Sequence, residues 1–162
     1  MYNLNSVYSD CKRNIEAMGI PIAKEIRVSV NRRAHKRYGQ CKKERNEYSI
    51  NINVDLLNEQ NPLSALQNTM YHELLHTCPG CMNHGEQWKK YAAKVNKITG
   101  LNIKRCSSPD EKGLNLFYQN AKYSVVCKEC GKKWAYQRAG KVVQHPEKFK
   151  CRCGGKLAVF EN

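Results

Sequence analysis

The sequence lacks a long hydrophobic run. None of its apolar stretches approaches the roughly 18 to 20 residues needed to span a bilayer. Its first residues, MYNLNSVYSDCKRN, have polar residues throughout and no apolar segment of the kind found in a secretory signal. Internal repeats and low-complexity tracts are also missing. We therefore expect no contact with a membrane and a cytoplasmic, reducing location.

Acidic residues are scarce. The chain has 14 Asp and Glu against 28 Lys and Arg, a formal net charge of +14. Basic charge on this scale favours contact with the phosphate backbone of nucleic acid, although a solvated basic surface is the alternative. We expect DNA as a partner through this basic surface; the oligomeric state is left open.

Cysteine, in contrast, is abundant. Nine cysteines are an odd number, which fits poorly with complete disulfide pairing. In a reducing location such cysteines indicate metal ligation or catalysis. The 162 residues suffice for one ordinary domain, or for a small domain with a metal-stapled module.

The first half of the chain predicts one helix and two strands. Apolar residues recur at helical spacing over residues 4–18, and Pro21 follows the end of that helix. Residues 25–30 and 48–54 alternate and predict strands. The basic segment 31–45 between them has no periodicity and is interpreted as irregular. One face of the second strand carries its apolar residues: Ile50, Ile52 and Val54.

Two further helices are predicted. Asn61 is expected to cap the first, with Pro62 at its first helical position. Pro79 and Gly80 end it, and the next helix runs from about Gly85 to Gly100. Apolar residues with helical spacing mark the first helix: Leu63, Leu66, Met70 and Leu74. The second has its own apolar side: Trp88, Tyr91, Ala92, Val95 and Ile98.

The first of these helices contains an H-E-x-x-H motif, His72-Glu73-Leu74-Leu75-His76. Residues four apart lie one above the other on a helix, so His72 and His76 can bind one zinc ion. Glu73 is offset by one position and can reach the metal-bound water rather than the metal. Zinc lowers the pKa of such a water towards about 7, so that Glu73 can accept its proton as the catalytic base.

A catalytic zinc needs a third protein ligand and an open fourth position. His84 is our first candidate, because it lies beyond a tight Cys78-Pro79-Gly80-Cys81 turn at the start of the next helix. Glu86 is the second candidate, since a glutamate from the following helix is another common solution.

Four further cysteines predict a structural zinc site, in two short motifs 20 residues apart: Cys127, Cys130, Cys151 and Cys153. Four thiolates fill a tetrahedral zinc completely, so the site should be structural. The segment between the motifs predicts a hairpin whose minimal core comes from its aromatic residues: Trp134, Tyr136 and Phe149. With the surrounding Lys and Arg, the aromatic residues can also hold a nucleic acid; a solvated surface is the equal alternative.

The other cysteines have less definite assignments. Cys78 and Cys81 can bind a second metal, form a reversible disulfide or simply pack, and packing is favoured because small buried cysteines are common. Cys11 lies on an apolar helix face and is expected in the core. Cys41 and Cys106 are unassigned.

The run HELLHTCPGCMNHGEQW resembles the SprT-like family, which pairs H-E-x-x-H with a later H-G-x-x-[WF]; here His84, Gly85 and Trp88 match. The segment from Tyr38 to Cys41 and the cysteine ribbon are also similar, so the resemblance extends over nearly the whole chain. It implies a small zincin fold with His72, His76 and His84 as ligands and Glu73 as base. It also implies DNA as a partner, since the eukaryotic member Spartan cleaves proteins crosslinked to DNA.

Together these observations predict an α+β chain with two zinc ions, one catalytic and one structural. We expect a catalytic domain over residues 1–104, a linker over 105–121 and a four-cysteine ribbon over 122–162. The expected function is a zinc-dependent endopeptidase that acts on proteins or peptides, including DNA-bound or DNA-crosslinked proteins. The alternatives are a DNA-binding or adaptor protein with an inactive peptidase fold and an amidase for small substrates.

Overall fold

The computed structural model describes residues 1–34, 37–107 and 121–161. The chain divides into two compact units, Met1–Gly113 and Leu114–Asn162. Most of the expected linker, residues 108–120, lies outside the described residues. No described helix is long and apolar enough to cross a membrane.

The first unit contains a three-stranded mixed sheet. Its strands are β1 (Ile26–Asn31), β2 (Gly39–Glu44) and β3 (Glu47–Asn53), in the order β1-β3-β2. β1 runs parallel to β3, which requires a crossover, whereas β2 pairs antiparallel with β3 through a tight turn. The central strand is therefore β3, and β2 is an edge strand.

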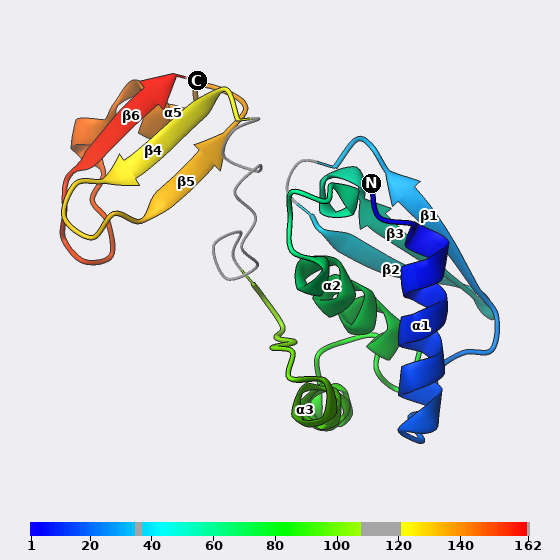
Figure 1. Cartoon of the computed structure of the whole chain (residues 1–162). Helices are drawn as coiled ribbons and strands as arrows, with labels where there is room; N and C mark the ends of the chain where they lie inside the picture. The colour runs from blue at the N-terminus through cyan, green and yellow to red at the C-terminus, as the bar shows by residue number, and fades with distance from the viewer. Residues whose placement is uncertain (35–36, 108–120, 162) are drawn as a thin grey trace. The chain divides into compact units, whose positions relative to one another are not determined.

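Three helices accompany this sheet: α1 (Leu4–Ala17), α2 (Leu63–Leu75) and α3 (Glu86–Thr99). Figure 1 shows α1 and α2 next to each other in front of the sheet, with α3 packed on α2. A short 3₁₀ helix, η1 (Val54–Leu57), connects β3 to the segment before α2. Helices and small sheets together make the chain α+β, as predicted.

The core of this unit lies between β3 and α2. Ile50 and Ile52 of β3 are fully buried, and α2 contributes Leu66, Met70 and Leu74, which are fully buried as well. The alternation of the strand and the helical spacing of α2 each place an apolar face towards the other element. Because this packing buries α2 on the sheet, the helix that carries the H-E-x-x-H motif is held rigidly.

Three predictions for the first unit were wrong. Residues 31–45 were expected to be irregular but contain β2, an edge strand whose exposed residues need no apolar alternation. Asn61 does not cap α2; Pro62 precedes the helix, and Asn61 Nδ2 donates instead to the carbonyl of Asp55 at 2.7 Å. Val54 belongs to η1 rather than to the strand.

Two residues expected on apolar helix faces are exposed. Leu63 is 38% exposed at the first turn of α2, and Ile98 is 59% exposed in the last turn of α3. Both lie at helix ends, where the neighbouring elements no longer cover the apolar stripe.

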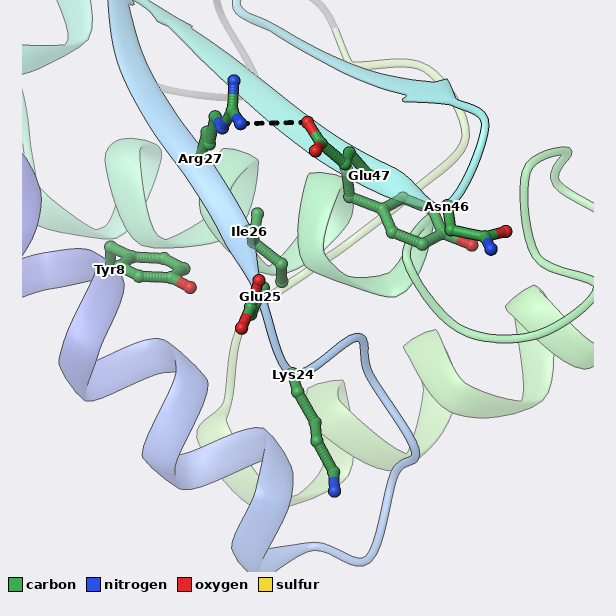
Figure 2. Close-up of a pocket in the computed structure, with 8 residues that line it drawn as sticks. Tyr8, Lys24, Glu25, Ile26, Arg27, Asn46 and Glu47 are labelled. Atoms are coloured by element: carbon green, nitrogen blue, oxygen red, sulfur yellow. Dashed lines mark ion pairs between the residues drawn. The ribbon is translucent and has the colours of Figure 1, made fainter.

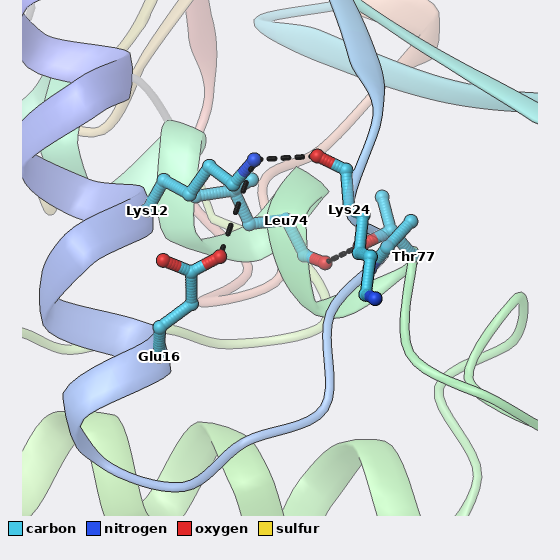
Figure 3. Close-up of polar contacts among 6 residues, drawn as sticks. Lys12, Glu16, Lys24, Leu74 and Thr77 are labelled. Carbon is cyan, nitrogen blue, oxygen red and sulfur yellow. Dashed lines mark hydrogen bonds and ion pairs between the residues drawn. The ribbon is translucent and has the colours of Figure 1, made fainter.

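Figure 3 shows how the segment between α1 and β1 is fastened to the end of α2. Thr77 Oγ1 donates to the carbonyl of Leu74 at 2.7 Å and accepts from the backbone N–H of Ala23 at 3.2 Å. Lys12 Nζ donates to the carbonyl of Lys24 at 2.5 Å. The Thr77 contacts tie this segment to the end of α2, where the motif lies, and the Lys12 contact ties it to α1.

The second unit is a small antiparallel sheet with the strand order β5-β4-β6. Its strands are β4 (Tyr123–Cys127), β5 (Lys133–Tyr136) and β6 (Leu157–Glu161). Between β5 and β6 lie α5 (Lys141–Gln144) and the 3₁₀ helix η3 (Pro146–Lys148).

The predicted aromatic core of the second unit is only partly confirmed. Trp134, Tyr136 and Phe149 are half-buried rather than buried. The most buried side chains are smaller: Ala121, Val125, Cys127, Val143 and Cys151. A unit of this size buries a smaller fraction of its surface, and its core is centred on Val125 and the cysteine cluster.

Candidate metal centre and active site

Three histidine side chains converge in the first unit. His72 and His76 lie one turn apart at the end of α2, and His84 lies just before α3. The Nε2 atom of His72 is 3.3 Å from Nε2 of His76 and 3.0 Å from Nε2 of His84. The chain reversal after α2 thus brings His84 to the pair, as the sequence predicted.

The other ring nitrogens of the helix pair face backbone carbonyls. His72 Nδ1 lies 3.0 Å from the carbonyl oxygen of Lys104, and His76 Nδ1 lies 2.7 Å from that of Cys81. A carbonyl oxygen can only accept, so both Nδ1 atoms carry the proton and donate. In the neutral rings each Nε2 therefore presents a lone pair to the centre of the cluster.

This donor set fits a zinc ion. Lone pairs that face one another at about 3 Å repel unless a proton or a metal cation lies between them. Zinc–nitrogen bonds of about 2.0–2.1 Å in tetrahedral geometry separate two ligand nitrogens by about 3.3 Å. The distances between the histidine nitrogens, 3.0 and 3.3 Å, agree with this value.

The protonation of the cluster also suits metal binding. Burial lowers the pKa of His76, although the hydrogen bond to Cys81 acts in the opposite direction. Burial likewise lowers the pKa of His84, helped by the positive charges of His76 and Arg105. Both rings therefore remain neutral, the form in which they bind a metal, to a lower pH than exposed histidines.

Trp88 of α3 forms a wall of the cluster. Its ring centroid lies 4.9, 5.7 and 4.6 Å from those of His72, His76 and His84. The side chain is 2% exposed, and its buried Nε1 has no hydrogen-bond partner in the described part of the chain. The indole excludes water from one side of the histidines and restricts their rotation.

Glu73 lies under β2. Its side chain is buried, and a Cβ atom added to Gly39 would come within 2.7 Å of Glu73 Oε1 and 2.8 Å of Thr69 Cγ2. Glycine at the start of β2 therefore permits the close approach of strand and carboxylate. Cys41 on the same strand is affected as well, because burial and then the Glu73 charge raise the pKa of its thiol to about 12.

Among the described residues, the histidine cluster contains neither of the neighbouring glutamates. Glu73 lies beside it, and Glu86, our second candidate for the third ligand, is exposed at the start of α3. His84 rather than Glu86 thus completes the set of three converging side chains.

Residues 6–107 match the model of the SprT-like family, which is well over half of the chain. The chain belongs to the SprT-like family. Its first unit is therefore a zincin-like, metallopeptidase-type domain. The match does not include the ribbon, which we had expected the family resemblance to cover. No curated protein matches the chain.

Outside this SprT-like domain, the four predicted ribbon cysteines converge: Cys127, Cys130, Cys151 and Cys153. Cys127 Sγ lies 3.5 Å from Cys153 Sγ, and Cys130 Sγ lies 3.6 Å from Cys151 Sγ. Zinc–sulfur bonds of about 2.3 Å in tetrahedral geometry separate sulfurs by about 3.8 Å, so four thiolates at these distances are compatible with zinc.

Backbone amides face the sulfur of Cys127. The N–H of Cys130, and then that of Glu129, lower the pKa of Cys127 to about 7. Gly155 also lies close, since a Cβ atom there would be 2.6 Å from Cys127 Sγ. Such amides stabilise thiolates, the form that binds metal.

Cys78 and Cys81 are free and almost completely buried, with exposed fractions of 1% and 0%. Burial raises the pKa of Cys78 to about 12 and also raises that of Cys81. Buried thiols of this kind are unreactive. The geometry therefore favours packing among the three alternatives considered for this pair, and Cys11 is buried as expected.

Three contacts of the site were not predicted from the sequence. The carbonyl of Lys104 reaches His72 from the segment after α3, Gly39 approaches Glu73 from β2, and Trp88 contacts all three histidines. The family motif includes Trp88, but only the packing of α3 on α2 shows what it touches.

A separate pocket of about 330 Å³ lies near the start of β1 and contains none of the predicted site residues. Figure 2 shows the ion pair between Arg27 and Glu47 at 3.0 Å on its wall. Both side chains are largely exposed, at 80% and 70%, so the pair contributes little to stability.

Proposed function

We propose that this protein is a zinc-dependent endopeptidase whose substrates are proteins or peptides. The observation that carries the proposal is the convergence of three histidine Nε2 atoms. Glu73 follows the first of these histidines, His72, on α2. Membership of the SprT-like family supports it.

In this proposal the chain's residues have distinct tasks. His72, His76 and His84 hold zinc, which when bound supplies a Lewis acid that polarises the scissile carbonyl and makes a water more acidic. Glu73 accepts a proton from the attacking water and passes it to the leaving amine. The carbonyls of Lys104 and Cys81 keep two of the histidines in the required tautomer.

An extended peptide suits the surroundings of Glu73. β2 is an edge strand with β3 as its one neighbour among the described strands, and its Gly39 lies against Glu73. A substrate backbone that adds to a free strand edge gains main-chain hydrogen bonds without requiring a particular side chain. This arrangement favours a peptide over a small amide as substrate.

Glu73→Gln is the direct test. The variant keeps the size of the side chain and should retain both zinc ions, while peptide hydrolysis should fall by about 10²–10⁴-fold. Glu86→Gln is the matched control and should cleave like the wild type. Equal cleavage by Glu73→Gln and the wild type would overturn the mechanism.

Zinc content per chain should be measured first, for the wild type and for the variants His84→Ala and Cys151→Ser. We expect about two zinc ions in the wild type and the loss of one in each variant. A single zinc that survives His84→Ala but not Cys151→Ser would leave the histidine site empty. That result would favour an adaptor with an inactive peptidase fold.

We also propose that DNA is a partner and that the substrates include DNA-bound or DNA-crosslinked proteins. The net charge of +14 supports this part of the proposal. DNA binding should weaken steeply with salt, because phosphate contacts release counterions. Binding that is absent at low salt, or insensitive to salt, would remove DNA from the proposal.

A further inference from the structure

The segment that follows α3, residues 102–105, is held against both neighbouring helices. Asn96 of α3 binds Ile103 twice: its Oδ1 accepts from the backbone N–H at 2.7 Å, and its Nδ2 donates to the carbonyl at 3.1 Å. Asn68 of α2 donates from Nδ2 to the carbonyl of Asn102 at 3.2 Å. The side chain of Ile103 is buried as well. We call residues 102–105 the anchored segment, because these contacts fix its backbone beside α2 and α3.

The anchored segment brings Arg105 to the histidine cluster. The carbonyl of Lys104 accepts from His72 Nδ1 at 3.0 Å. Consecutive Cα atoms are about 3.8 Å apart, so the backbone of Arg105 begins within one residue of that contact. The charge of Arg105 also acts on His84: after burial and the charge of His76, it helps to lower the pKa of that ring. The backbone contact and the electrostatic effect both place the guanidinium beside the cluster.

Two neighbouring stripes of α2 define the sides from which groups approach the histidines. Thr69 and Glu73 face β2, because a Cβ atom added to Gly39 would come close to both. Asn68 and His72, each one residue earlier, face the anchored segment. Successive residues of a helix point about 100° apart, so the two stripes face different elements. Glu73 and the anchored segment therefore reach the cluster from different sides.

Arg105 has no carboxylate partner among the described residues. Its side chain is exposed and forms no ion pair there. Three neutral histidines would leave a bound zinc with the full charge of a divalent cation. Two cations close together repel each other unless an anion lies between them. In peptide hydrolysis such an anion forms on the scissile carbonyl oxygen.

We propose that Arg105 is a catalytic residue that donates hydrogen bonds to the scissile carbonyl oxygen while negative charge develops on it. In this step the water oxygen bonds to the carbonyl carbon, the π electron pair moves to the carbonyl oxygen, and Glu73 takes the water proton. The electron pair returns when the C–N bond breaks and the amine leaves with the proton from Glu73. The guanidinium stays protonated throughout. The inference rests on the proposed peptidase function and adds a second catalytic group to it.

Kinetics of the full, zinc-loaded chain test this role, with a fluorogenic peptide that spans a bond which the wild type cleaves in denatured casein. Arg105→Ala should lower kcat by about 10²–10³-fold, the usual effect of removing one donor to such an oxygen. KM should stay within about threefold, because the bond is made only in the transition state. Arg105→Lys keeps the charge but loses the planar fork of donors, so its kcat should lie between the two. Added guanidinium, below the concentration that unfolds the chain, should restore part of the activity of Arg105→Ala and none of that of Glu73→Gln.

A transition-state analogue gives a measurement that does not depend on turnover. A phosphinic version of the same peptide carries a tetrahedral anion in place of the scissile amide, and calorimetry measures its affinity. Arg105→Ala should weaken this affinity by about the same factor as kcat/KM. Affinity for the uncleaved peptide, measured in the Glu73→Gln background, should change by less than about threefold when Arg105→Ala is added. Zinc content should be unchanged.

Lys97→Ala is the matched control. It also removes one exposed positive charge from the first unit, in the last turn of α3. It should cleave the peptide and bind the phosphinic analogue like the wild type. Equal losses in Lys97→Ala and Arg105→Ala would mean that only the total charge matters, which would overturn the inference.

The remaining outcomes separate the inference from the proposed function. If Glu73→Gln is inactive while Arg105→Ala keeps the wild-type kcat and analogue affinity, the inference is wrong and the proposed function stands. A loss confined to peptides with an acidic residue beside the scissile bond would show that Arg105 recognises a side chain instead. Loss of zinc from Arg105→Ala would make the residue structural, and either result overturns the inference. A wild type that cleaves no bond of denatured casein, with or without DNA, would contradict both proposals.

Discussion

Gly39 is the residue whose replacement should affect Glu73 most directly. A methyl group in its place would lie 2.7 Å from Glu73 Oε1, so the carboxylate must move. We predict that Gly39→Ala keeps zinc on the three histidines but lowers peptide hydrolysis by about 10²-fold, because a displacement of about 1 Å costs that much in a positioned catalytic group. Zinc content and initial rates measure the two effects.

Gly140→Ala provides the comparison. Gly140 has an extended backbone and nothing within 4 Å of an added Cβ atom. The substitution should change neither rate nor zinc content. If Gly39→Ala behaved in the same way, Glu73 would not depend on the close approach of β2.

Cys11 should make the free energy of unfolding of the first unit depend on pH in the alkaline range. Burial raises the pKa of its thiol from 9.0 to about 12, although a hydrogen bond with Tyr71 lowers it. Between these values the folded chain keeps a proton that the unfolded chain loses, so the free energy of unfolding falls as pH rises above about 9. The contribution is present in full below pH 9.

Cys11→Ala should make this fall shallower by up to about 1.4 kcal/mol per pH unit. Urea unfolding of the first unit at pH 8.5 and 10.5 measures the difference. Cys106→Ala is the control, because it removes a thiol that is exposed in the folded chain. Identical slopes for Cys11→Ala and the wild type would mean that Cys11 ionises in the folded chain.

At the scale of elements, the turn after α2 orients one of the histidines. Gly80 has φ 72° in the turn that Cys81 closes by donating its N–H to the carbonyl of Cys78 at 3.0 Å. The carbonyl of Cys81 in turn accepts from His76 Nδ1. Backbone strain in this turn should therefore reach the metal site.

We predict that Gly80→Ala lowers zinc affinity at the histidines by about 10- to 100-fold, the usual effect of disturbing a hydrogen-bond partner of a ligand. The expected strain is about 1–2 kcal/mol. Gly100→Ala is a matched control, because Gly100 also has φ 72° and open space but ends α3. It should lose similar stability and keep its zinc affinity; equal losses of affinity would refute the role of the turn.

At the scale of the whole molecule, the two units should unfold independently of each other. Cys127→Ser removes a ribbon ligand and should unfold the second unit, because a small unit of this kind depends on its metal. Trp134 reports on the ribbon and Trp88 on the histidine cluster, so the fluorescence of each is followed with the other replaced by Phe. Loss of both signals in one transition would contradict the prediction.

The two candidate metal sites also differ in their ligands and in their surroundings. A zinc ion held by three histidines would keep a fourth position open, whereas one held by four cysteines would keep none. His72 and His76 lie at the end of a helix that is buried against a sheet, while two of the four cysteines, Cys127 and Cys151, belong to the ribbon core. Removal of zinc should thus inactivate the first unit and unfold the second.

The sequence alone determined most of the converging side chains, although the choice of His84 over Glu86 needed the structure. The i, i+4 spacing of His72 and His76, the tight turn before His84 and the two cysteine motifs are local patterns. Backbone geometry converts such spacings directly into proximity. For the same reason the main helices and the central strand were predicted correctly.

Only the tertiary structure decided what surrounds those side chains. The carbonyl of Lys104, the close approach of Gly39 and the position of β2 arise from segments far apart in the chain. The pairing of β4 with β6 likewise joins strands that are separated by a long connection. Such contacts result from the packing of whole elements against one another. A local sequence pattern specifies the helix or strand but not the elements on which it packs.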